Sequence, residues 1–183
     1  MIISLPEYKF LYIRIPKTGS TSIADALKSY TLKRASIRNT LSIFYKRPDI
    51  KKYAKNSKRY FKFSFVRNPW DRMVSRYVYG VKHGDTYRDF DKWLVAFIKN
   101  NPNKINQLNW IEPIKDISFI GRFETLQEDF NSVCNCINIP TVILPHRNKS
   151  KRRKDYRHYY TTKTKNIVNK YCQKDIDTFH YSF

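Results

Sequence analysis

Residues 15–23 combine side chains that can bind a phosphate group. The stretch reads Ile-Pro-Lys-Thr-Gly-Ser-Thr-Ser-Ile, and it holds one full charge, Lys17, and one glycine, Gly19. The glycine lets the backbone approach a ligand closely or adopt a positive φ. Four hydroxyl groups around it can donate hydrogen bonds to phosphate oxygens; they belong to Thr18, Ser20, Thr21 and Ser22. The stretch therefore predicts an anion site in which Lys17 supplies the mobile charge.

A strand and a helix are expected on either side of this loop. Residues 9–15 are rich in aromatic and β-branched side chains and have the length of one buried strand. After the loop, apolar residues recur with the spacing of an amphipathic helix, at Ile23, Ala26, Leu27 and Tyr30. The unpaired N–H groups and the dipole at the start of a helix favour an anion. A strand-turn-helix whose Ser and Thr only cap the helix would show the same pattern, so the stretch alone leaves both interpretations open.

A second strand-to-helix junction follows about 50 residues later. Phenylalanines alternate with Lys62 and Ser64 over residues 61–65, which is the period of a strand. Asn68 then suits the N-cap of a helix and Pro69 its first position. Arg67 stands between the strand and the helix, where its planar guanidinium can bind a phosphate through two parallel hydrogen bonds.

Two interpretations of Arg67 stay open from its own segment. The guanidinium can bind a phosphate, or it can pair with a carboxylate such as that of Asp71. Taken with the first junction, however, Arg67 fits an open α/β sheet in which ligands bind beyond the carboxyl ends of the strands. Two such corners are suited to hold the two ends of one bisphosphorylated nucleotide.

The rest of the chain shows weaker patterns of secondary structure. They predict one or two short helices over 31–60 that break near Pro48, a helical face over 90–98, a short strand over 117–121, a helix that begins with a Thr125–Glu128 capping box, and a terminal helix around 167–172. A basic loop over 144–154 precedes that last helix. We expect one domain over residues 1–183, with an α/β, P-loop-like three-layer fold in which helices flank a mainly parallel central sheet.

Charge indicates the class of partner. Lys and Arg number 36 against 15 Asp and Glu, which gives a formal net charge of +21. This excess suits a polyanion: nucleic acid, an anionic membrane surface, an acidic glycan or a multiply charged nucleotide. The charge does not choose among them. With 41% hydrophobic and 16% aromatic residues, the chain is not a disordered tail.

The cysteines and the lengths of the apolar runs indicate the cellular compartment in which we expect the protein. The three cysteines, Cys134, Cys136 and Cys172, fit neither a disulfide framework nor a zinc site, so we expect free thiols and no bound metal. No apolar run approaches the ~20 residues of a membrane span, and Glu7 and Lys9 come too early for the core of a signal peptide. A cytoplasmic protein is expected, whose contact with a membrane would be peripheral.

The two junctions together resemble a known family. Pro-Lys-Thr-Gly-Ser-Thr-Ser at 16–22, followed by Phe-Val-Arg-Asn-Pro-Trp-Asp-Arg and Val-Ser from 65 to 75, is similar to the sulfotransferases that include carbohydrate sulfotransferases and short microbial and viral relatives. The resemblance continues, more diffusely, through Gly-Arg-Phe-Glu at 121–124 and Leu-Pro-His-Arg-Asn-Lys-Ser at 144–150. It implies an enzyme that uses 3′-phosphoadenosine 5′-phosphosulfate (PAPS) as the sulfate donor.

The resemblance also implies roles for particular residues. The first motif, Lys17 to Ser22, would bind the 5′-phosphosulfate, whereas Arg67 and Ser75 would bind the 3′-phosphate. The C-terminal loop would add contacts from Lys149, Ser150 and Lys151. Lys17 would stabilise the oxygen that leaves with the phosphate.

The general base is not identified by the motifs. Several branches of the family use a His or Glu after the first helix, but residues 33–59 of this chain contain neither. Among the four histidines, His83 follows the helix of the second motif and is the candidate that we carry forward.

Three classes of function are therefore compared. A sulfotransferase that acts on an acceptor hydroxyl, with a carbohydrate preferred, accounts for both junctions and for the charge. A P-loop phosphotransferase accounts only for the first junction, and a Walker A loop would place its lysine after a second glycine, whereas Lys17 precedes Gly19. A non-enzymatic polyanion or nucleic-acid binder accounts for the charge but not for the paired motifs.

Overall fold

The computed structural model describes residues 2–5, 8–32, 59–114, 116–145 and 155–183. The chain divides into two compact units. The first comprises Met1–Val66 and Trp110–Arg147, and the second comprises Arg67–Asn109 and Asn148–Phe183. The helices predicted within 31–60 and most of the basic loop lie outside the described residues.

The first unit contains a four-stranded sheet. Its strands are β1 (Ile2–Leu5), β2 (Phe10–Ile13), β3 (Phe61–Val66) and β4 (Phe119–Arg122), arranged in the order β1-β2-β3-β4. The β2-β3 and β3-β4 pairs are parallel, and β1 pairs antiparallel with β2. The predicted α/β fold with a mainly parallel sheet flanked by helices is confirmed, whereas β1 was not expected. Because β2, β3 and β4 are parallel, the chain leaves all three at the same edge of the sheet.

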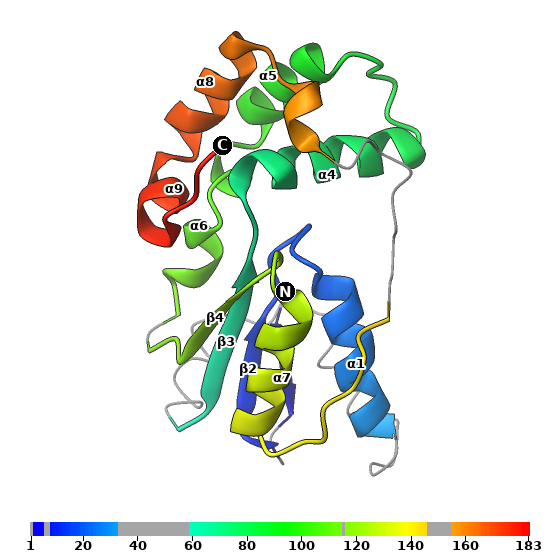
Figure 1. Cartoon of the computed structure of the whole chain (residues 1–183), viewed down its shortest axis with the longest axis vertical. Coiled ribbons are helices and arrows are strands. Elements are labelled where there is room, and N and C mark those ends of the chain that lie inside the picture. The colour runs from blue at the N-terminus through cyan, green and yellow to red at the C-terminus, as the bar shows by residue number, and fades with distance from the viewer. Residues whose placement is uncertain (1, 6–7, 33–58, 115, 146–154) are drawn as a thin grey trace. The chain divides into compact units, whose positions relative to one another are not determined.

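Alternation of side chains builds the core of this unit. Every second residue of β2 and β3 faces the helices α1 (Ser20–Leu32) and α7 (Leu126–Cys136), which lie beside the sheet in Figure 1. Tyr12 stacks on Phe63 at a centroid distance of 4.8 Å within this layer. The alternate residues Leu11 and Ile13 lie on the other face of the sheet, where they pack with Ile114. One face of the sheet therefore fixes the start of α1, which follows directly from the loop after β2.

The capping box predicted at the start of α7 is wrong. Thr125 does occupy the N-cap position, but its side chain makes no capping hydrogen bond. Its hydroxyl instead donates to Oδ2 of Asp129 at 2.9 Å, and the same oxygen accepts from the backbone N–H of Arg122 at 2.6 Å. A carboxylate one turn into the helix thus holds the hydroxyl that the sequence pattern assigned to the cap, and it ties the end of β4 to α7.

The second unit is helical. Its elements are α4 (Pro69–Lys82), α5 (Phe90–Asn100), η2 (Pro102–Lys104), η3 (Tyr156–Tyr159), α8 (Thr162–Tyr171) and α9 (Gln173–Phe179), while the short α6 (Leu108–Ile111) spans the boundary between the units. The start of α4 is as predicted: Oδ1 of Asn68 accepts hydrogen bonds from the N–H groups of Trp70 and Asp71, and Pro69 occupies the first turn.

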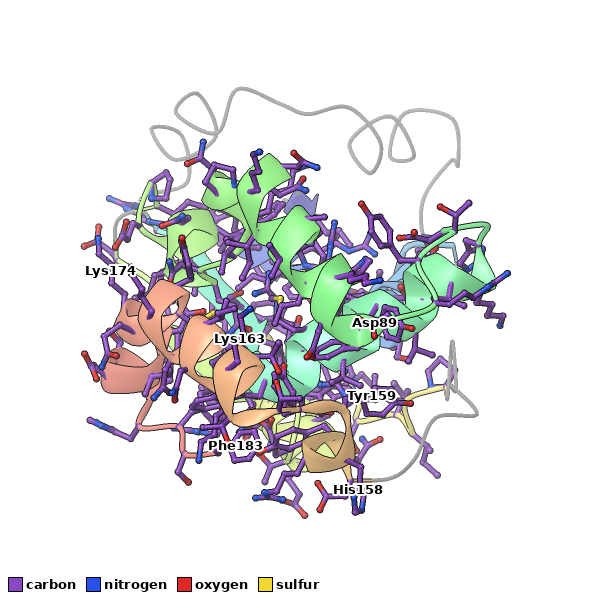
Figure 2. All side chains as sticks on the ribbon, turned by 90° about the horizontal axis from the view of Figure 1, so that it is seen from above. Asp89, His158, Tyr159, Lys163, Lys174 and Phe183 are labelled. Carbon is purple, nitrogen blue, oxygen red and sulfur yellow. The ribbon has the colours of Figure 1, made fainter. Side chains whose placement is uncertain are left out.

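Aromatic rings form much of the core of the second unit. Phe183 lies 5.6 Å from the ring of Trp70 and 5.5 Å from that of Tyr160. Tyr159 contacts Tyr77 and Phe90, with centroid distances of 6.4 and 5.9 Å; Figure 2 labels Tyr159 and Phe183. These contacts pack α4, α5 and the C-terminal segment together, and so they support the helix that follows Arg67.

No helix in the described part of the chain is both long and apolar enough to span a bilayer.

Candidate functional site

The loop between β2 and α1 has an unusual backbone. Lys17 and Gly19 both adopt a φ of +74°. This conformation is ordinary for glycine but unfavourable for a residue with a Cβ, at a cost of roughly 1–2 kcal/mol. A lysine kept in such a conformation indicates that its position serves something other than stability.

The loop ends at the open first turn of α1. The N–H of Ile23 donates to the carbonyl of Gly19 at 3.2 Å, so Gly19 is the N-cap, and Ser20, Thr21 and Ser22 form the first turn. The N–H groups of a first turn have no acceptor within their own helix, and they carry the positive end of the dipole. That turn contains no acidic residue, which is also true of α8, whereas α4, α5 and α7 each carry at least one there. An anion from outside the helix would therefore meet no carboxylate belonging to this turn.

The hydroxyl groups of the loop differ in their surroundings. The Thr18 side chain is fully buried, and its hydroxyl donates to the carbonyl of Ile15 at 3.0 Å. Because a hydroxyl has one hydrogen, Thr18 holds the loop in shape, and a phosphate would meet its backbone N–H. Ser22 is also buried, while Ser20 is half-buried and Thr21 is exposed.

Leu126, the first residue of α7, packs against Gly19. A Cβ placed on Gly19 would lie 2.6 Å from Cδ2 and 3.0 Å from Cδ1 of Leu126. A methyl group at this position would therefore sit on an unfavourable φ, and it would displace the end of the Leu126 side chain. No pattern in the sequence indicated this contact, because Leu126 lies more than a hundred residues further along the chain.

The second predicted corner lies at the start of α4. The guanidinium of Arg67 donates from Nε and Nη2 to Oδ2 of Asp71, at 2.8 and 2.6 Å. The ion pair that the sequence offered as an alternative is thus present. Phosphate binding by Arg67 stays a prediction beside this ion pair.

The backbone of Arg67 is also held. Its N–H donates to Oε1 of Gln107 at 2.9 Å, and its carbonyl accepts from Nε2 of Gln107 at 2.9 Å. Gln107 is fully buried and was not among the predicted site residues. The sequence carried no local signal for this contact, since 40 residues separate the two partners.

The other predicted residues lie further along α4 or beyond the described chain. Ser75, one turn after Asp71, is half-buried. His83 is the exposed C-cap of α4, and its ring lies 4.1 Å from that of Tyr79. The 14 residues of α4 span about 21 Å, so His83 and Arg67 stand at opposite ends of this helix. Lys149, Ser150 and Lys151 lie outside the described residues.

A mainly parallel sheet, flanked by helices, in which a strand leads through a glycine turn into a helix defines an α/β protein with a P-loop-like fold. Within the described residues, no group of three or more His, Cys, Asp and Glu is placed to hold a metal ion. The family model described as "Sulfotransferase family" matches residues 1–182, and the chain belongs to that family. The predicted resemblance, and with it the prediction of a sulfotransferase, is confirmed.

The individual proteins that match this chain have low sequence identity to it. Human carbohydrate sulfotransferase 14 is 24% identical over 192 residues, which cover 82% of this chain and 49% of the human protein. The chain thus spans about half the length of that relative. An uncharacterized protein of Archaeoglobus fulgidus is 34% identical over 91 residues, 44% of this chain and 70% of that protein.

One solved structure has the same fold. Mouse sulfotransferase SULT7A1, complexed with PAP, aligns over 90% of this chain and 82% of the mouse chain with a TM-score of 0.57. The sequence identity is 14%, so the likeness concerns the fold.

Proposed function

We propose that this protein transfers the sulfuryl group of PAPS to an acceptor hydroxyl, and that the acceptor is a carbohydrate. The observation that carries the proposal is the corner between β2 and α1, where Lys17 and Gly19 share a positive φ ahead of a helix start without acids, in a member of the sulfotransferase family. The PAP in the mouse structure supports the donor. The match to human carbohydrate sulfotransferase 14 supports the acceptor class.

Lys17 and the first turn of α1 take the phosphosulfate end of the donor in this proposal. The acceptor oxygen forms a bond to sulfur while the bond from sulfur to the 5′-phosphate oxygen breaks, which yields a sulfate ester and 3′-phosphoadenosine 5′-phosphate (PAP). Negative charge grows on the oxygen that leaves, by analogy with phosphoryl transfer. An ammonium and backbone N–H groups fixed beside that oxygen stabilise the transition state more than the ground state. The proposed reaction uses these groups, rather than a metal ion, against the leaving oxygen.

Arg67 and Ser75 take the 3′-phosphate. The guanidinium is a charge-assisted, geometrically specific donor for a phosphate, and Ser75 adds a hydroxyl from the next turns of α4. Lys149, Ser150 and Lys151 add contacts from the C-terminal loop. The acceptor proton passes to a base, for which His83 remains the predicted residue.

Calorimetric titration tests the donor site. Wild type should bind PAP far more tightly than AMP or ATP at moderate salt, and Arg67→Ala should remove most of that preference. Binding of all three nucleotides with equal strength, or binding that disappears with added salt, would refute the proposal and leave a polyanion binder, because non-specific phosphate contacts weaken steeply with ionic strength.

Measurements of turnover distinguish the proposed roles of Lys17 and Arg67. Lys17→Ala should lower kcat strongly, on the order of a hundredfold as for loss of one oxyanion donor, with little change in PAP affinity. Arg67→Ala should chiefly weaken PAP binding. Sulfate transfer from labelled PAPS should be measured with a panel of glycans, and with lipid, peptide and phenol acceptors as comparison. Equal, small effects of both substitutions would contradict the assigned roles, and transfer confined to the non-glycan acceptors would refute the acceptor class alone.

A further inference from the structure

A buried polar network lies behind Arg67 in the second unit. Gln107 exchanges two hydrogen bonds with the backbone of Arg67, one to each side of its Cα. These bonds fix the two peptide groups that flank Arg67, and therefore the direction in which its side chain leaves the main chain. Asp71 holds the other end of the same side chain. Arg67 is thus held at both its backbone and its guanidinium.

Asp175 on α9 orients Gln107. Its carboxylate is fully buried and accepts hydrogen bonds from the backbone N–H of Gln107, at 2.9 and 2.7 Å, and from that of Leu108 at 3.0 Å. It also accepts from Nε2 of Gln107 at 3.2 Å. A carboxylate offers only acceptors, so it turns the NH2 group of the amide toward itself and leaves Oε1 for the N–H of Arg67.

Arg72 supports the same segment from α4. Its buried guanidinium donates to the carbonyls of Ile105 and Lys104, at 2.5 and 2.9 Å. Burial lowers the pKa of Arg72 to about 10, so the group stays charged at neutral pH, and the charges of Arg72 and Asp175 act on each other. Burial also raises the pKa of Asp175, while its hydrogen bonds to Gln107 and Leu108 lower it.

Such a network is costly compared with apolar packing. Gln107 and Asp175 are both fully buried, and an apolar residue at 107 would avoid the loss of hydration that the amide undergoes. What an apolar residue cannot do is define the orientation of the Arg67 backbone.

We propose that Gln107, oriented by Asp175, is a positioning residue that sets the guanidinium of Arg67 for the 3′-phosphate of the donor. The inference rests on the proposed function, because it assigns the discrimination between PAP and AMP to the accuracy with which Arg67 is placed. Gln107 acts through Arg67 and does not touch the nucleotide.

The test compares PAP and AMP binding in matched variants of the full chain. Gln107→Met keeps the length of the side chain and removes both hydrogen bonds to Arg67. PAP affinity should fall about tenfold, as expected for the loss of one or two hydrogen bonds, while AMP affinity stays within about twofold. Thr164→Val serves as the control, since it removes buried hydrogen bonds from the start of α8 without touching Arg67. It should lower the melting temperature and leave the ratio of PAP to AMP affinity unchanged.

A double-mutant cycle separates positioning from general destabilisation. In an Arg67→Ala background, Gln107→Met should have no further effect on PAP affinity, since the residue that it positions is gone. Asp175→Asn, nearly isosteric, repeats the test by a second route: it should reduce PAP affinity selectively, because its amide no longer fixes the orientation of Gln107. This variant decides the question if Gln107→Met does not fold.

The outcomes distinguish the two proposals. Unchanged PAP affinity in folded Gln107→Met, or in folded Asp175→Asn, with a large loss in Arg67→Ala, would overturn the positioning role and leave the proposed function intact. Equal affinity of wild type for PAP and AMP would overturn the proposed function itself, and the positioning role with it.

Discussion

Gly19 allows a quantitative test of the loop between β2 and α1, which we propose binds the phosphosulfate. A Cβ at this position would meet Cδ2 of Leu126 at 2.6 Å and Cδ1 at 3.0 Å, and it would sit on a backbone with φ of +74°. The backbone strain costs roughly 1–2 kcal/mol. Forcing a methyl group into a filled space costs roughly 1–3 kcal/mol more. Gly19→Ala should therefore lower the free energy of unfolding by about 2–5 kcal/mol.

Leu126→Ala separates the two contributions. It creates the space that the new methyl group needs, so the steric part of the Gly19→Ala cost should vanish in the double variant, while the strain from the positive φ stays. The two substitutions should then couple by about 1–3 kcal/mol, whereas distant sites add. Val133→Ala is the matched control, because Val133 is buried on the same helix about 10 Å further along, and it should add to Gly19→Ala without coupling.

Urea unfolding of the single and double variants provides the measurement, with coincident transitions from two probes to establish two-state behaviour. PAP titration of the folded variants reports the shape of the loop independently. Strict additivity of Gly19→Ala and Leu126→Ala would refute the packing argument. A loss below about 1 kcal/mol in Gly19→Ala would refute the backbone argument as well.

Two further predictions concern the stability of the chain. Lys17→Gly and Lys17→Ala should both lose turnover. The glycine variant should melt at a higher temperature than the alanine variant, by about 2–4 °C for each kcal/mol of relieved strain, because glycine accepts the φ of +74°. A melting temperature of Lys17→Gly below that of Lys17→Ala would contradict this account of the loop. Burial raises the pKa of the Cys134 thiol to about 11 and that of Cys172 to about 12. The folded chain therefore keeps two protons that the unfolded chain releases above about pH 9, and the free energy of unfolding should fall with rising pH there, by about 1.4 kcal/mol per pH unit for each thiol. Replacing Cys134 or Cys172 by Ala should reduce this slope in alkaline urea unfolding, whereas the same change at exposed Cys136 should not.

Local patterns predicted the elements that carry the two corners. Alternating phenylalanines placed β3, and Asn68 with Pro69 placed the start of α4, because each pattern depends on neighbours within one turn or one strand. The antiparallel β1 was missed, since the four residues Ile2–Leu5 are too few to show a period of their own and gain their conformation by pairing with β2.

Contacts between distant segments could not be predicted from one sequence. Gln107 and Asp175 lie 68 residues apart and meet only when α9 packs in the second unit. The failed capping box at Thr125 shows the same limit at short range: the pattern was present, but Asp129 competed for the hydroxyl and bound it. The motif residues were therefore accessible to sequence reasoning, whereas the residues that hold them were not.

The two cations of the motifs are held in ways that match different tasks. Arg67 is fixed at its backbone by Gln107 and at its guanidinium by Asp71, so little conformational freedom is left to lose when a phosphate binds, and its contribution should appear in affinity. Lys17 is placed by a strained turn beside a helix start, at a measurable cost in stability. Strain of this kind persists because the surrounding structure imposes it, and it is concentrated at functional sites. In the proposed reaction Lys17 meets the leaving oxygen, an interaction that is stronger in the transition state than in the ground state. For this reason the loss of Lys17 should appear in kcat and the loss of Arg67 in binding, and the reverse result would mean that the strained loop serves the ground state.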